Sequence, residues 1–115
     1  IDLAPTTLCA CDDKPTPEMT GINLLDLVVD GKPIERDTLY GEILAHDVAD
    51  IDDPSASLLY RWIIDGDMKL ILPQGGGPAE LYNLSSDPHE NKNLAGDNTA
   101  LVKQLSEKLD QWWKP

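Results

Sequence analysis

The stretch LLYRWIIDGDMKLIL, residues 58–72, decides the fold, because two apolar runs flank Asp65-Gly66 in it. Apolar, β-branched and aromatic runs around an Asp-Gly pair predict a β-hairpin with a two-residue turn. Counting outward from a type I′ turn at this pair places Ile63 opposite Met68. The side of the hairpin that carries Ile63 is the more apolar one, and we expect it to lie under a helix. The other side mixes aromatic and charged residues, which suits contact with a neighbouring domain.

The flanking sequence supplies two more strands and a helix. Residues 38–45, TLYGEILA, are rich in strand-forming types and lead into an acidic loop at residues 46–54. Residues 80–84, ELYNL, form a fourth predicted strand after a glycine-rich connection. Residues 99–114 predict a helix with an apolar stripe on one side and charges on the other. The stripe consists of Leu101, Leu105, Leu109 and Trp112. The predicted fold is therefore α+β, a four-stranded antiparallel sheet covered on one face by a long C-terminal helix.

The first 36 residues are predicted to form a separate segment. A short helix is expected over residues 1–10, with Asp2 as its cap or first-turn acid. Two prolines then interrupt regular structure, and a second short apolar stretch at residues 22–29 ends at Asp30-Gly31. Residues 32–36 are a connector. We therefore divide the chain into a short helical N-terminal region, 1–36, and a sheet-and-helix domain, 37–115.

Composition narrows the classes of function. The chain has 115 residues, a formal net charge of -12 and a hydrophobic fraction of 41%, which fits a globular protein with one modest core. The acidic balance argues against binding to nucleic acid or to an anionic membrane surface. Its apolar runs are too short to span a bilayer, and no signal peptide is present. Because the chain opens on Ile1, we expect a fragment whose targeting information lay upstream.

Four short motifs stand in an order that is known from one protein family. Residues 2–6, DLAPT, are similar to D-[IL]-x-P-T, and residues 19–25, MTGINLL, to M-x-G-x-S-L-L. Residues 61–71, RWIIDGDMKLI, are similar to R-x-x-R-D-G-x-W-K-L-I. Residues 80–95, ELYNLSSDPHENKNLA, are similar to E-L-Y-D-L-x-x-D-P-x-E-x-x-N-L-A. On these residues the chain resembles the C-terminal end of the sulfatases, the arylsulfatase-like family of the alkaline phosphatase superfamily.

The resemblance implies a C-terminal sulfatase subdomain at residues 37–115, preceded at residues 1–36 by the tail of the catalytic domain. It implies a parent that hydrolyses sulfate esters, with a sulfated carbohydrate or aryl sulfate as substrate and the missing N-terminal catalytic domain as partner. Such a parent is expected to be secreted or periplasmic and to use calcium and a formylglycine. The formylglycine arises from a C/S-x-P/A-x-R motif, which neither Cys9 nor Cys11 begins. The fragment alone is therefore expected to be inactive, with no catalytic residue, metal or cofactor of its own.

One cluster is a candidate for function. Glu42, His46 and Asp47 are predicted near the end of a strand that enters the acidic loop, where binding residues are often displayed. Since the C-terminal subdomain of sulfatases can contribute to the substrate pocket, these residues are candidates for its rim. Arg61, on the apolar side of the hairpin, is expected to pair with a carboxylate, with Glu80 as one candidate.

Two other interpretations stay open. The chain could be a free-standing acidic α+β interaction module, which would have an initiator methionine close upstream. It could also be the C-terminal part of a related phosphatase or phosphoglycerol transferase of the same superfamily. The run of residues 80–95 favours the sulfatases.

Overall fold

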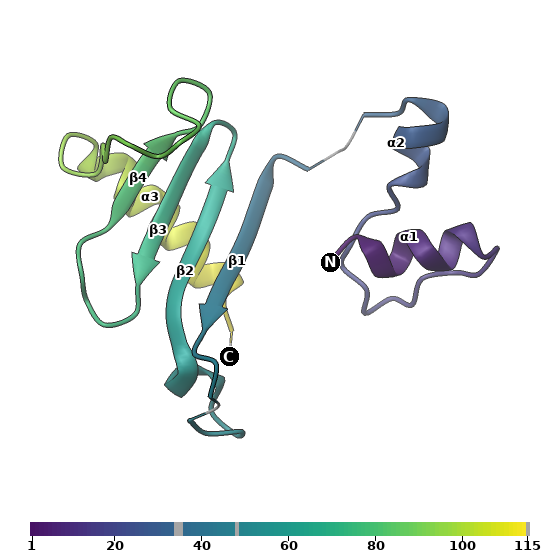
Figure 1. The fold of residues 1–115 in the computed structure, drawn as a ribbon, viewed down its shortest axis with the longest axis horizontal. Coiled ribbons are helices and arrows are strands. Elements are labelled where there is room, and N and C mark those ends of the chain that lie inside the picture. The colour runs from purple at the N-terminus through teal and green to yellow at the C-terminus, as the bar shows by residue number, and fades with distance from the viewer. Residues whose placement is uncertain (34–35, 48, 115) are drawn as a thin grey trace. The chain divides into compact units, whose positions relative to one another are not determined.

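The computed structural model describes residues 1–33, 36–47 and 49–114, and the chain divides into two compact units, Ile1–Arg36 and Asp37–Pro115 (Figure 1). Each unit is described by itself. Within the described ranges, no helix combines the length and the apolar character that crossing a membrane requires. That the first unit is the tail of a catalytic domain stays a prediction.

The first unit contains two short helices, α1 (Leu3–Ala10) and α2 (Leu25–Asp30). Gly31 ends α2 in the left-handed conformation, with φ of 66°, as its position after the apolar stretch predicts. Asp2 occupies the predicted N-cap position of α1, but its side chain makes no capping hydrogen bond there and instead accepts one from the Ile22 amide. Residues 34 and 35 of the predicted connector lie outside the described residues.

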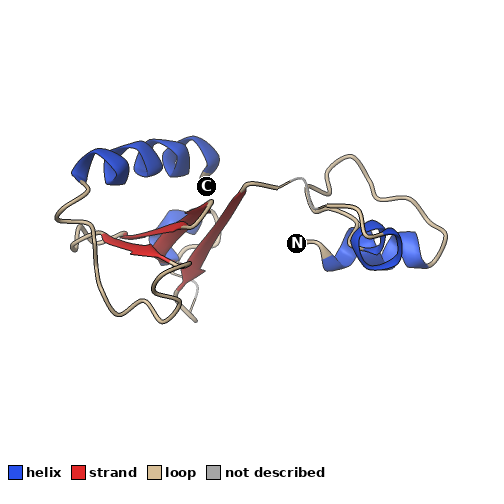
Figure 2. Ribbon diagram, turned by 90° about the horizontal axis from the view of Figure 1, so that it is seen from above, coloured by secondary structure: helices blue, strands red, loops and turns tan. Residues whose placement is uncertain are grey.

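The second unit is the predicted sheet and helix. Its elements are β1 (Thr38–Leu44), the short 3-10 helix η1 (Pro54–Ser57), β2 (Leu58–Asp65), β3 (Met68–Pro73), β4 (Glu80–Asn83) and α3 (Thr99–Trp112). The strands lie in the order β1-β2-β3-β4, and each neighbouring pair is antiparallel. Figure 2 shows α3 along one face of this sheet. The α+β fold class and the C-terminal helix are thus confirmed.

The hairpin register differs from the predicted one by two residues. Ile63 lies opposite Leu70, and Asp65 closes the strand opposite Met68. Gly66 therefore takes the first central position of the turn with φ of 57°, the position that a type II′ turn reserves for glycine. Because side chains alternate between faces with a period of two, this shift leaves every residue on its predicted face.

The core lies between α3 and the sheet. Five side chains, each at most 1% exposed, form it: Ile63, Leu70, Leu81, Leu105 and Leu109. The face of the hairpin that was predicted to be covered is the covered one, and α3 covers it with leucines of the predicted stripe. Trp112, at the C-terminal end of that stripe, remains 41% exposed and stacks on Tyr40.

Candidate functional site

The three predicted site residues fall into two groups. Glu42 lies in β1, and its Oε2 accepts a hydrogen bond from the indole Nε1 of Trp113 at 2.5 Å. His46 and Asp47 follow in the loop, fully exposed, with Nδ1 of the histidine 3.3 Å from Oδ1 of the aspartate. The structure therefore joins Glu42 to the end of α3, whereas His46 and Asp47 contact each other as sequence neighbours.

An aromatic hollow adjoins Glu42 at the C-terminal end of α3. It has a volume of about 340 Å³ and is lined by Glu42, Pro54, Trp112, Trp113 and Lys114. The rings of Trp112 and Tyr40 are stacked, with centroids 5.0 Å apart and planes 10° apart. The sequence identified Glu42 but assigned the tryptophans to helix packing, since nothing local indicates that residues 71 positions apart are neighbours.

Arg61 is paired, but not with the expected partner. Its Nη1 lies 2.8 Å from Oδ1 of Asp110 on α3, and its guanidinium lies 5.3 Å from the ring centroid of Trp113. The Arg61–Glu80 pair is wrong because the observed register places Glu80 on the opposite face of the sheet. Glu80 instead accepts a hydrogen bond from the Tyr82 hydroxyl at 2.6 Å, which raises the pKa of Tyr82 to about 12.

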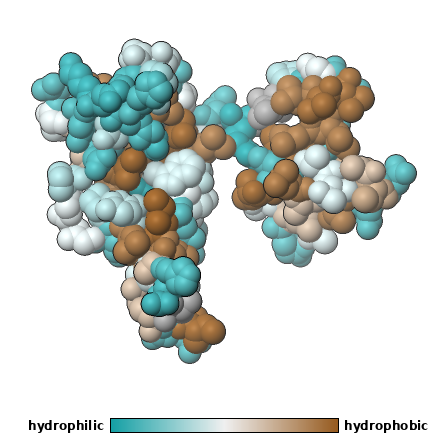
Figure 3. Space-filling model, in the orientation of Figure 1, coloured by the Kyte–Doolittle hydropathy of each residue, from teal (hydrophilic) through white to brown (hydrophobic). Residues whose placement is uncertain are grey.

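The face of the sheet away from α3 is rich in apolar and aromatic side chains. Its apolar and aromatic residues on the first three strands are Leu39, Ile43, Tyr60, Trp62, Ile64 and Ile71. Leu39 is 42% exposed, Ile43 49% and Tyr60 40%. Figure 3 looks onto this face and shows brown and pale surface over the middle of the sheet. We call this set of residues the free face.

Gly41 shapes the free face. A Cβ atom built on Gly41 would lie 2.2 Å from the indole ring of Trp62 on the neighbouring strand. The missing side chain therefore lets the Trp62 ring lie directly against the β1 backbone, because any other residue would collide with it.

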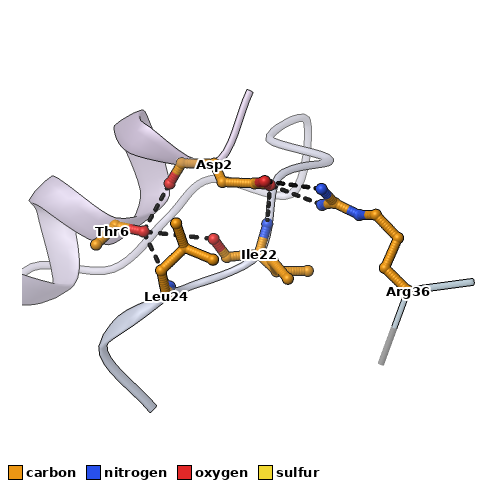
Figure 4. A network of polar contacts seen from close by, with 5 residues as sticks. All are labelled: Asp2, Thr6, Ile22, Leu24 and Arg36. Atoms are coloured by element: carbon orange, nitrogen blue, oxygen red, sulfur yellow. Dashed lines mark hydrogen bonds and ion pairs between the residues drawn. The ribbon is translucent and has the colours of Figure 1, made fainter. Parts of the chain in front are cut away.

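The motif at residues 2–6 has a structural role in the first unit (Figure 4). The Asp2 carboxylate accepts hydrogen bonds from Nη1 and Nη2 of Arg36, at 2.7 and 2.6 Å, and from the Ile22 amide at 2.9 Å. The Arg36 guanidinium, followed by the Ile22 amide, lowers the pKa of Asp2 to about 2. Thr6 Oγ1 accepts from the Leu24 amide at 3.0 Å. Both residues thus tie α1 to the chain that leads into α2.

Metal ligands do not converge in the part of the chain that the structure describes. Within it, no three His, Cys, Asp or Glu side chains gather in a geometry that could hold a metal ion. Cys9 and Cys11 are both free thiols. The donor set of these residues therefore does not fit a calcium site.

The fold is similar to that of solved hydrolases, although no family model and no curated protein matches the chain. A phosphonate monoester hydrolase of Agrobacterium radiobacter matches with a TM-score of 0.71 and 27% identity over 96% of this chain and 23% of that chain. A protein solved in complex with its substrate D-glucosamine-2-N,6-O-disulfate matches with a TM-score of 0.72 and 22% identity, over 96% of this chain and 22% of that chain. A 2-O GAG sulfatase matches with a TM-score of 0.73 and 21% identity, over 96% and 23%.

The chain thus spans about a quarter of the length of these proteins, while almost all of it is matched. The resemblance that the four motifs indicated is confirmed by the fold. The chain has the fold of the C-terminal part of sulfatases and related hydrolases.

Proposed function

We propose that this chain is the C-terminal region of an enzyme that hydrolyses sulfate esters, and that it completes the fold of a catalytic domain outside these 115 residues. The observation that carries the proposal is the match of 96% of the chain to 23% of a 2-O GAG sulfatase. The order of the four motifs supports it independently.

The free face is the surface that we assign to contact with the catalytic domain. Three of its apolar or aromatic side chains on β1 and β2 are more than a third exposed, namely Leu39, Ile43 and Tyr60. Burying apolar surface stabilises an interface by about 25 cal/mol per Å². α3 already covers the other face, so the free face is the side on which a further layer can pack.

The chemistry itself is assigned to the catalytic domain. The resemblance to sulfatases implies that the formylglycine nucleophile and the calcium ion belong to that domain. The C/S-x-P/A-x-R motif from which formylglycine arises does not occur in this chain. The chain supports the catalytic domain, and by itself it is expected to hydrolyse nothing.

A finer part of the proposal concerns the substrate rim. We propose that His46 and Asp47, which project fully exposed from the loop after β1, shape the sugar or aryl subsite of the intact enzyme, with Glu42 nearer to the sheet. In the full-length enzyme, His46→Ala should lower kcat/KM on the natural substrate, whereas the exposed His89→Ala should leave it unchanged. Equal kcat/KM for both variants and the parent would remove His46 from the rim.

Sulfate ester hydrolysis is tested with the protein of the complete reading frame. We expect it to hydrolyse 4-nitrophenyl sulfate or a sulfated saccharide, and to lose solubility or activity when residues 37–115 are deleted. Phosphonate monoesters are the second substrate class, because the similar structure with 27% identity is a phosphonate monoester hydrolase. Turnover of a phosphonate monoester without any sulfate ester would replace the sulfatase proposal by that one.

A further inference from the structure

We propose that the aromatic hollow at the C-terminal end of α3 binds an uncharged sugar ring, with Trp112 as the stacking surface. In Figure 1 the C-terminal end of α3 lies beside the end of β1, and the Glu42–Trp113 hydrogen bond joins the two elements there. The inference concerns binding by this chain itself. It does not depend on whether the parent enzyme hydrolyses sulfate esters.

The exposed indole of Trp112 is held in a fixed orientation by Tyr40. Tyr40 covers one face of Trp112 in a parallel stack, with planes 10° apart, so the 41% exposure of Trp112 falls on its edges and its other face. The stack also fixes the orientation of the ring, because Tyr40 belongs to the sheet. A fixed and half-exposed aromatic ring is a suitable surface for the apolar C–H face of a pyranose, which combines an apolar body with polar edges.

Two charged residues, Glu42 and Lys114, line the hollow beside the aromatic rings. Glu42 uses Oε2 to accept from Trp113, and no described residue donates to its Oε1, which leaves an acceptor for ligand hydroxyls. Lys114 lines the same hollow and is the second charged residue there. A few placed polar groups on a mainly apolar lining are typical of small-molecule sites.

The charges at the hollow select among classes of ligand. The only ionisable residues in the described lining are Glu42 and Lys114, whose charges are opposite and cancel. The Arg61 guanidinium nearby is already paired with Asp110 and lies over the Trp113 ring. The carboxylate of Glu42 would repel a sulfate or carboxylate, and the positive charge of Lys114 would repel an organic cation. The lining therefore favours a neutral polyol over either ion.

The size of the hollow also limits the ligand. A volume of about 340 Å³ lies at the lower end of the range of roughly 300–1,000 Å³ that small-molecule sites occupy. The hollow therefore fits a mono- or disaccharide. Because one aromatic surface and two polar groups make few contacts, we expect dissociation constants in the millimolar range.

The test is a titration of the 115-residue chain with neutral disaccharides, namely maltose, lactose and cellobiose, followed by NMR of the three indole N–H signals. At least one sugar should shift the signals of Trp112 and Trp113 in a saturable way, with half-saturation below about 50 mM. The Trp62 signal, which reports on the free face, should stay in place and serves as the internal control.

Variants separate binding from folding. Trp112→Ala should weaken sugar binding at least about tenfold, about 1.4 kcal/mol, and Trp112→Tyr should weaken it less because it keeps an aromatic ring. Unchanged backbone signals in Trp112→Tyr establish that the fold is intact. The proposal is overturned if no disaccharide shifts the two indoles, if Trp112→Ala binds as tightly as the parent, or if only a sulfated disaccharide binds.

Discussion

Truncation of Leu109 to alanine should remove much of the stability of the second unit. Leu109 is fully buried and packs in the core with Ile63, Leu70 and Leu81. Fully buried Leu→Ala changes cost about 2–5 kcal/mol, because burial is lost and a cavity remains. A domain of about 80 residues is stable by only roughly 4–12 kcal/mol. The variant should therefore lose a large fraction of that free energy, and its Tm should fall by about 10–30 °C.

The assay is urea and thermal unfolding followed by far-ultraviolet circular dichroism. Gln104→Ala is the matched control, because Gln104 lies exposed on the same helix and alanine is a good helix former, so its free energy of unfolding should change by less than about 0.5 kcal/mol. If Leu109→Ala unfolds at the same urea concentration and temperature as the control, then α3 does not cover the sheet as described.

Two further perturbations address other contacts. The pKa of Asp2 is lowered to about 2. The stabilisation that its carboxylate gives the first unit is therefore fully present above about pH 4 and is lost as the pH falls through about 2. An NMR titration of the Asp2 carboxyl with a midpoint near the ordinary value of 3.8 would contradict this. Gly41→Ala should displace the Trp62 ring and destabilise the sheet by about 1–3 kcal/mol, seen as a changed Trp62 indole signal. Gly75→Ala, whose added Cβ would meet no atom within 4 Å, should leave both stability and the indole signal unchanged.

The faces of the sheet could be predicted from sequence, but the register of its hairpin could not. Alternation with a period of two placed Ile63 on the covered side whatever the position of the turn. The position of the turn depends on Asp65, which accepts hydrogen bonds from Thr38 at 3.0 Å and from Lys108 at 2.5 Å. These partners lie 27 and 43 positions away, so nothing within the hairpin sequence indicates that Asp65 remains in the strand.

At the candidate site, too, the sequence predicts individual residues but not the contacts between them. The sequence identifies Glu42 as an acid near the end of a strand, from residue type and position alone. The hydrogen bond from Trp113 and the pairing of Arg61 with Asp110 form only when α3 packs on the sheet. An aromatic pair at the end of a helix predicts burial, whereas Trp112 stays 41% exposed and stacks on Tyr40, a contact that forms only in the folded unit.

We propose that this chain is the C-terminal part of a sulfatase. The most direct test is to determine the coding sequence upstream of Ile1. The account predicts a continuous reading frame that encodes a catalytic domain with a C/S-x-P/A-x-R motif. An in-frame stop codon followed by an initiator methionine directly before Ile1 would contradict it, because the chain would then be an independent acidic module.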